Sequence, residues 1–271
     1  MTNDLLDLLN TYTAPFGVTV SPEQWEKFDA YMDILTLWNG KINLTAITEP
    51  SGIVVKHFAD SLSAAPYIRE YSEKRSGRKG AVRLCDVGTG AGFPGIPLKI
   101  VFPETELVLV DSLEKRINFL WAVSEELGLS GVDLLHARAE DAGRLAGFRD
   151  SFDVVAARAV APMNVLLEYC APFVKPGGIF VSMKGSRAED GFSKAAAQLS
   201  VKLSRCDRFI LGENGSAGSD LPGENAATGG QKTSAAENDS FGRTIYVFEK
   251  TGPTPKAFPR KAGTPSKNPL K

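Results

Sequence analysis

The sequence predicts an α/β fold of the Rossmann-like type, in which a largely parallel sheet is preceded by a cap of helices. A short apolar run over 82–87 ends in a turn that carries four glycines within eight residues. From Ala81 onward, strand-like apolar runs alternate with helical patterns, the order that gives parallel strands with helices on both faces. The first 70 or so residues instead carry apolar side chains at helical spacing.

Residues 1–79 are predicted to form this helical cap and a linker. Ser21-Pro22-Glu23-Gln24 is typical of a helix start, with serine as N-cap and glutamine at N3 completing a capping box. An apolar face follows, and Gly40 is expected to end the helix; the face consists of Trp25, Phe28, Met32, Leu35 and Trp38. A second helix is expected over 53–65. The polar stretch 72–80, with four cationic side chains, is expected to be a solvated linker.

Residues 80–250 are predicted to hold the sheet. The expected strands are 82–87, 106–110, 132–136, 152–157 and 179–183, and the expected helices begin near Pro94 and cover 113–127, 164–173 and 193–199. Two further strands, 207–211 and 243–249, are expected to pair antiparallel. They flank residues 212–242, which contain few large apolar side chains and are therefore expected to form a disordered insertion.

Residues 251–271 are expected to form a basic C-terminal tail. From residue 250 to the end the chain has no acidic residue, and its cations alternate with prolines: Lys250, Lys256, Arg260, Lys261, Lys267 and Lys271. This composition fits a basic arm for phosphate groups and a solvated tail equally well.

Composition excludes several classes of function. The chain has 271 residues and a net charge of −1, so a nucleic-acid partner requires a local basic patch. Three widely spaced cysteines and two histidines make a zinc site or a Ser–His–Asp triad implausible, and no metal is expected. No secretory signal and no run of about 20 apolar residues is present. A cytoplasmic, monomeric protein without membrane attachment is expected.

The glycine-rich turn indicates a nucleotide site, although an ordinary βα turn is the simpler alternative. Gly90-Ala91-Gly92-Phe93-Pro94-Gly95 fits the pattern G-x-G-x-x-G, and Asp111 follows Gly90 by 21 residues at the end of the second strand. This spacing suits NAD(P)-dependent oxidoreductases and S-adenosylmethionine enzymes alike. Asp86 favours the second class, because a carboxylate there attracts a sulfonium or ammonium and repels a pyrophosphate. The terminal strand pair points the same way.

The chain also resembles a known family over nearly its whole length, excluding 212–242, an insertion that the family does not lead us to expect. The matching segments are Trp38-Asn39, Asn43-Leu44-Thr45, Lys56-His57-Phe58-Ala59-Asp60-Ser61-Leu62, the run from Asp86 to Leu98, Asp111-Ser112-Leu113-Glu114-Lys115-Arg116, Arg138-Ala139-Glu140, Ala157-Arg158-Ala159, Lys184-Gly185 and the run from Pro259 to Pro265. Together they are similar to the RsmG (GidB) family of small-subunit ribosomal RNA guanine-N7 methyltransferases.

This resemblance implies a seven-stranded class I methyltransferase that binds S-adenosyl-L-methionine. It implies backbone contacts around Gly88 and Phe93, with Gly90 and Asp86 in the same loop. Further contacts are implied from Asp111 to the ribose, from Ala139 and Glu140 to the adenine, and from Arg158 to cofactor and substrate. These positions follow different strands of one parallel sheet, so their carboxyl ends converge on one crevice.

No general base is expected, because guanine N7 has a free lone pair and attacks without deprotonation. Arg158 and Lys184 are the candidates for positioning the base, and the RNA candidates are Lys56, His57, Arg138, Arg187, Arg260 and Lys261. His57 fits a buried core histidine equally well. The rival functions are an NAD(P)-dependent oxidoreductase and a non-catalytic RNA-binding protein on a methyltransferase fold. The expected partner is small-subunit rRNA or the 30S particle.

Overall fold

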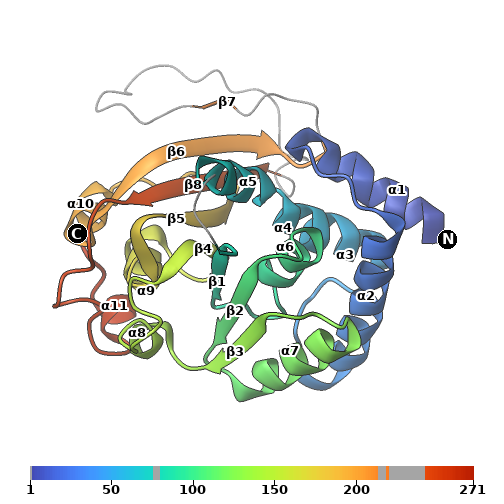
Figure 1. The fold of residues 1–271 in the computed structure, drawn as a ribbon, viewed down its shortest axis with the longest axis horizontal. Coiled ribbons are helices and arrows are strands. Elements are labelled where there is room, and N and C mark those ends of the chain that lie inside the picture. Colours follow the sequence, from blue (N-terminus) through green and yellow to red (C-terminus); the bar gives the residue numbers. More distant parts are fainter. Residues whose placement is uncertain (1, 76–79, 213–217, 220–241) are drawn as a thin grey trace.

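The predicted alternation of strands and helices forms one mixed sheet in a computed structural model that describes residues 2–75, 80–212, 218–219 and 242–271 (Figure 1). Its order is β3-β2-β1-β4-β5-β8-β6-β7. Strands β1 to β5 are parallel, whereas β8 runs antiparallel to both β5 and β6. The bounds are β1 Arg83–Val87, β2 Glu106–Asp111, β3 Val132–His136, β4 Phe152–Arg158, β5 Val174–Gly185, β6 Val201–Ile210, β7 Gly218–Ser219 and β8 Gly242–Lys250. The predicted Rossmann-like fold is confirmed.

Each central strand is buried on both sides, and alternate residues enter two different cores. In β1, Leu84 packs in the core under the N-terminal helices, whereas Cys85 and Val87 pack in the other core. The two-residue period of a strand explains this division. The helices that follow the strands are α6 Gly95–Val101, α7 Glu114–Glu126, α8 Ala139–Ala142, α9 Met163–Cys170 and α10 Ser193–Gln198.

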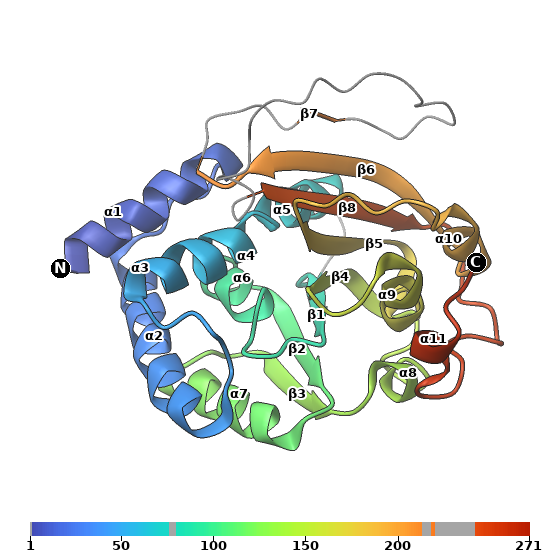
Figure 2. The same cartoon turned by 180° about the vertical axis from the view of Figure 1, so that it is seen from behind.

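The N-terminal helices cover the face of the sheet that carries α6 and α7 (Figure 2). Helix α1 Thr2–Thr13 and the short turn η1 Ala14–Phe16 were not predicted. Helix α2 Pro22–Ile42 begins with the predicted capping box of Ser21 and Gln24. The predicted end at Gly40 is wrong, because the helix continues to a left-handed Asn43, at φ 48°. Beyond that end, the side-chain oxygen of Asn39 accepts the N–H groups of residues 44 and 45.

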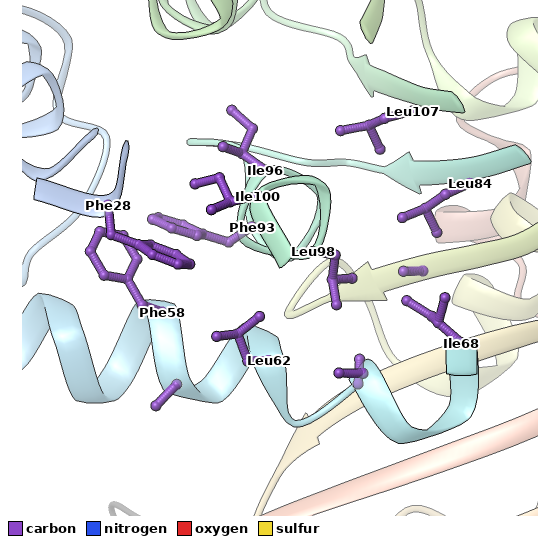
Figure 3. Packing of buried hydrophobic residues seen from close by; sticks show 14 of the residues in the cluster. Phe28, Phe58, Leu62, Ile68, Leu84, Phe93, Ile96, Leu98, Ile100 and Leu107 are labelled. Atoms are coloured by element: carbon purple, nitrogen blue, oxygen red, sulfur yellow. The ribbon is translucent and has the colours of Figure 1, made fainter. Parts of the chain in front are cut away.

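The predicted second helix is a longer and broken one. It consists of α3 Pro50–Ile53, a π-helical segment η2 Val54–Ala59, α4 Asp60–Leu62 and, after a two-residue break, α5 Ala65–Lys74. Its apolar side packs Phe58 against Phe28, with ring centroids 4.9 Å apart, and against Phe93 of the glycine-rich turn (Figure 3). The predicted linker therefore starts inside α5, and its residues 76–79 lie outside the described residues.

From β5 onward, the bounds of the strands differ from the prediction. Strands β5, β6 and β8 are longer than expected, and β5 includes the turn residues 175–178, which shift its register against β4. The disordered insertion predicted at 212–242 lies largely outside the described residues, but Gly218–Ser219 pairs with β6. The tail, which includes α11 Thr264–Lys267, packs along the body although many of its side chains are exposed. The guanidinium of Arg149 donates to carbonyls of Thr254 and Phe258 and holds it against the body.

No helix among the residues with a described structure is long and apolar enough to cross a membrane.

Candidate functional site

The glycine-rich turn after β1 holds its backbone against the neighbouring strand ends. Gly88 and Thr89 donate their N–H groups to the carbonyl of Val110, and Gly90 donates to the carboxylate of Asp111 at 3.0 Å. Gly88 has φ +72°, and a Cβ there would lie 2.8 Å from the side chain of Val160. Only glycine fits this position against Val160 without strain, and Gly88 lines both of the cavities described below.

Asp86 lies underneath this turn. Its Oδ2 accepts from the hydroxyl of Thr89 at 2.7 Å and from the N–H of Gly95 at 2.8 Å. Complete burial raises the pKa of Asp86 to about 6, although these two hydrogen bonds oppose the change. The side chain lines neither of the cavities described below. These hydrogen bonds fix the loop through Asp86, and the attraction of its carboxylate to a cationic ligand stays a prediction.

A cavity of about 280 Å³ lies at the carboxyl ends of strands β2 and β3, and it is here called the β2–β3 cavity. Its walls include the backbone of Gly88 and the predicted residues Asp111, Arg138, Ala139 and Glu140.

The carboxylate of Asp111 is nearly buried and already has three donors: the N–H groups of Gly90 and Leu113 and the guanidinium of Arg116 at 3.2 Å. Glu140 is also buried, and its Oε1 accepts the N–H of Gly263 at 2.7 Å.

A second cavity of about 470 Å³, the β4–β5 cavity, lies beside the first and shares Gly88, Arg116 and Ala159 with it. Its remaining walls come from the N-terminal helices and the loop after α2, from the glycine-rich turn, and from the ends of β4, β5 and β8: Leu44, Thr45, Lys56, His57, Asp60, Thr89, Gly90, Ala91, Phe93, Arg158, Met183, Lys184, Gly185 and Arg243. The two cavities meet where the strand order reverses between β1 and β4, the place at which open α/β sheets bind ligands.

Arg158 is held on the wall of the β4–β5 cavity by residues of the N-terminal helices. Its guanidinium donates to the carboxylate of Asp60 at 2.7 Å and lies 4.9 Å from the ring centroid of Phe93. Asp60, only 4% exposed, also pairs with Arg243, at 2.5 Å. One buried carboxylate thus pairs with two guanidinium groups from distant parts of the chain, and the three groups together keep one net positive charge.

His57 is neutral in this setting. Burial, followed by the nearby guanidinium of Arg158, lowers the pKa of His57 to about 4 from its ordinary value of 6.5. Its ring stacks on Phe93 with centroids 4.6 Å apart, and its Nε2 lies 2.7 Å from the hydroxyl of Thr45. The sequence left open whether His57 is a core histidine or a residue of the site. In the structure its side chain is half-buried and also lines the cavity.

The other predicted cations are spread more widely. Lys184 lines the β4–β5 cavity, where its Nζ donates to the carbonyl of Ala161 and pairs with Glu189 at 2.8 Å. Arg187 and Lys261 are exposed and line neither cavity. Arg260 donates to the fully buried carboxylate of Glu168 at 2.6 Å, so its guanidinium anchors the C-terminal segment.

Sequence reasoning assigned no role to Thr45, Asp60, Arg116 or Arg243. Arg116 follows the strand-end acid Asp111 by five residues, a spacing that signals contact across a loop and helix start. Arg243 gave no comparable signal, since its partner Asp60 lies 183 residues away. Within the described ranges, no group of three or more His, Cys, Asp and Glu side chains is placed to hold a metal ion.

The GidB family model, described as rRNA small subunit methyltransferase G, matches residues 24–211. The Ribosomal RNA small subunit methyltransferase G of Desulfitobacterium hafniense is 44% identical over 257 residues, 94% of this chain and 92% of that protein. The protein of the same name from Staphylococcus carnosus is 42% identical over 254 residues, 93% of each chain. A SAM dependent methyltransferase from Aquifex aeolicus superposes with a TM-score of 0.46 at 15% identity, over 76% of this chain and 96% of that one.

Proposed function

This chain belongs to the GidB family of rRNA small subunit methyltransferases G, and from that premise we propose that it transfers a methyl group from S-adenosyl-L-methionine to N7 of a guanine in small-subunit rRNA. The observation that carries the proposal is the pair of adjoining cavities at the β1/β4 switch point. One cavity has the residues for an adenosine, and the other is lined by aromatic and cationic side chains for a nucleobase.

The β2–β3 cavity fits the adenosine of the donor. Asp111 supplies a carboxylate for the ribose hydroxyls, and the bare backbone at Gly88 lets a ligand approach closely. Ala139 and Glu140 lie on the adenine side, with Glu140 fixed by its bond from Gly263. When bound, S-adenosylmethionine supplies an electrophilic methyl group on a sulfonium.

The β4–β5 cavity fits the acceptor base. Guanine N7 carries a lone pair, so the residues need to hold it in line with the methyl group and need not remove a proton. Arg158 and Lys184 are the proposed positioning residues, and Phe93 with His57 forms a flat wall of stacked rings. The base must leave the RNA stack to enter. Lys56, Arg138, Arg187 and Lys261 are the proposed phosphate contacts, and we place the reaction in the cytoplasm with a monomeric enzyme.

Two measurements test this function. Titration calorimetry is expected to show binding of S-adenosylhomocysteine and none of NADH, and the reverse result would support the oxidoreductase alternative. Incubation of the protein with labelled donor and 30S particles or naked rRNA from a strain that lacks this enzyme is expected to give 7-methylguanine by mass spectrometry. RNA binding without methyl transfer would support the non-catalytic alternative.

Arg158→Ala is expected to lose most methyl transfer, and a wild-type rate of transfer would remove Arg158 from the site.

A further inference from the structure

The backbone of Thr45 is fixed on the wall of the β4–β5 cavity. The side chain of Asn39, near the end of α2, accepts the N–H groups of Leu44 and Thr45 at 2.7 and 2.8 Å and donates to the carbonyl of Thr45 at 2.9 Å. Three hydrogen bonds from one amide therefore hold the segment that presents the Thr45 hydroxyl to the cavity.

The tautomer of His57 follows from its two neighbours. The guanidinium of Arg158 lies 3.3 Å from Nδ1 of His57 and can only donate, so Nδ1 accepts. The proton of the neutral ring then sits on Nε2, which donates to the Thr45 hydroxyl oxygen at 2.7 Å. A chain of donors thus runs from Arg158 through His57 to Thr45.

The hydroxyl oxygen of Thr45 also accepts the N–H of Ile47, at 3.0 Å. Both lone pairs of the oxygen are thereby used, so the remaining function of the group is to donate its proton. The described residues provide no acceptor for that proton, and the side chain lines the cavity. The hydroxyl is thus an oriented neutral donor toward whatever occupies the β4–β5 cavity.

We propose that Thr45 determines specificity for guanine by donating its hydroxyl hydrogen to O6 of the base. The inference rests on the proposed function and deepens it. N7 must keep its lone pair free for the methyl group, whereas the adjacent O6 is an acceptor on the same edge. Adenine carries an amino donor at that position, so two donors would face each other and adenine would be rejected.

The charges around the cavity agree with a neutral donor at this place. Methylation at N7 leaves a positive charge on the purine, which an uncompensated cation nearby would oppose. His57 is neutral, so the ring that orients the Thr45 hydroxyl adds no cation to Arg158 and Arg243, which share the single carboxylate of Asp60. The hydroxyl of Thr45 adds no charge, so it can read O6 without destabilising the methylated product.

The test pairs two variants with two substrates. Thr45→Val removes the hydroxyl at nearly constant volume, and Thr45→Ser keeps it. The substrates are small-subunit particles reconstituted from ligated rRNA with either guanine or 2-aminopurine, which has N7 but no O6, at the methylated position. Loss of one hydrogen bond is expected to lower kcat/KM of the wild type on 2-aminopurine by roughly tenfold. Thr45→Val is expected to lose roughly tenfold more on guanine than on 2-aminopurine, and Thr45→Ser to follow the wild type.

Equal losses for Thr45→Val on both bases would overturn the proposal, because the hydroxyl would then act only through His57 and Ile47. Equal rates of the wild type on both bases would overturn it as well, even if Thr45→Val did not fold. S-adenosylhomocysteine affinity is expected to be the same for all three proteins. A wild-type enzyme that forms no 7-methylguanine on the guanine substrate would instead refute the proposed function.

Discussion

Replacement of Asp60 by asparagine tests how Arg158 is held. The change keeps the shape of the side chain and removes the negative charge that faces Arg158 at 2.7 Å and Arg243 at 2.5 Å. The two arginine side chains are only 13% and 16% exposed, so water replaces the lost carboxylate only in part. Removing one partner of a buried ion pair costs about 3 kcal/mol at the low end of the usual range.

In a chain of this size, that loss corresponds to a decrease in Tm of roughly 6–12 °C. Urea unfolding followed by circular dichroism measures the free energy of unfolding directly. Glu70→Gln is the matched control, because it also removes one carboxylate charge that faces two cations, Lys74 at 2.8 Å and Arg205 at 3.4 Å, but Glu70 is 48% exposed. Each of these exposed pairs is expected to contribute less than about 1 kcal/mol. If Asp60→Asn cost no more than Glu70→Gln, the buried carboxylate would not be what holds Arg158 on the cavity wall.

Three further predictions concern the cofactor side, the C-terminal segment and the pH response. Gly88→Ala is expected to weaken S-adenosylhomocysteine binding in calorimetry by roughly tenfold, because alanine is strained at φ +72°; unchanged affinity would contradict this. Arg260→Ala is expected to lower the free energy of unfolding by about 3 kcal/mol by leaving Glu168 unpaired, whereas Lys261→Ala changes it by less than about 0.5 kcal/mol; equal effects would argue against the anchor. His57 has a folded-state pKa near 4, below its ordinary 6.5, so the folded state binds its proton less readily and stability is lost as pH falls through this window. The loss attributable to His57 is at most about 3 kcal/mol, and His57→Gln is expected to show a flatter profile between pH 6.5 and 4.

The parallel part of the sheet could be predicted because its strands are short apolar runs between turn signals. Both bounds of β3 were predicted correctly, and the bounds of β1, β2 and β4 were predicted to within one residue. Ends that depend on a competing signal were not predictable in the same way. Gly40 looked like a helix end, but a Cβ there would meet nothing within 4 Å, and the left-handed Asn43 ends the helix instead.

Tertiary contacts decided the roles that pattern alone could not. Asp86 looked like a ligand group because it precedes the glycine-rich turn, yet Thr89 and Gly95 use its carboxylate to fix that turn. Arg260 looked like a free cation because its neighbours are basic and proline-rich. Its partner Glu168 is 92 residues away, in a helix whose pattern gave no reason to expect a buried carboxylate.

The two halves of the candidate site differ in how local their signals are. The proposed donor side is built from strand ends and the loops that follow them. The spacing from the glycine-rich turn indicates Asp111, whereas Glu140 was implied by the family resemblance. The acceptor side brings together Thr45, Asp60, Arg158 and Arg243, which no spacing connects. Its proposed chemistry depends on one carboxylate shared by two guanidinium groups and on one histidine tautomer that orients a hydroxyl. These four residues come together only when the N-terminal helices have packed on the sheet, which is why the proposed base specificity has no short sequence signature here.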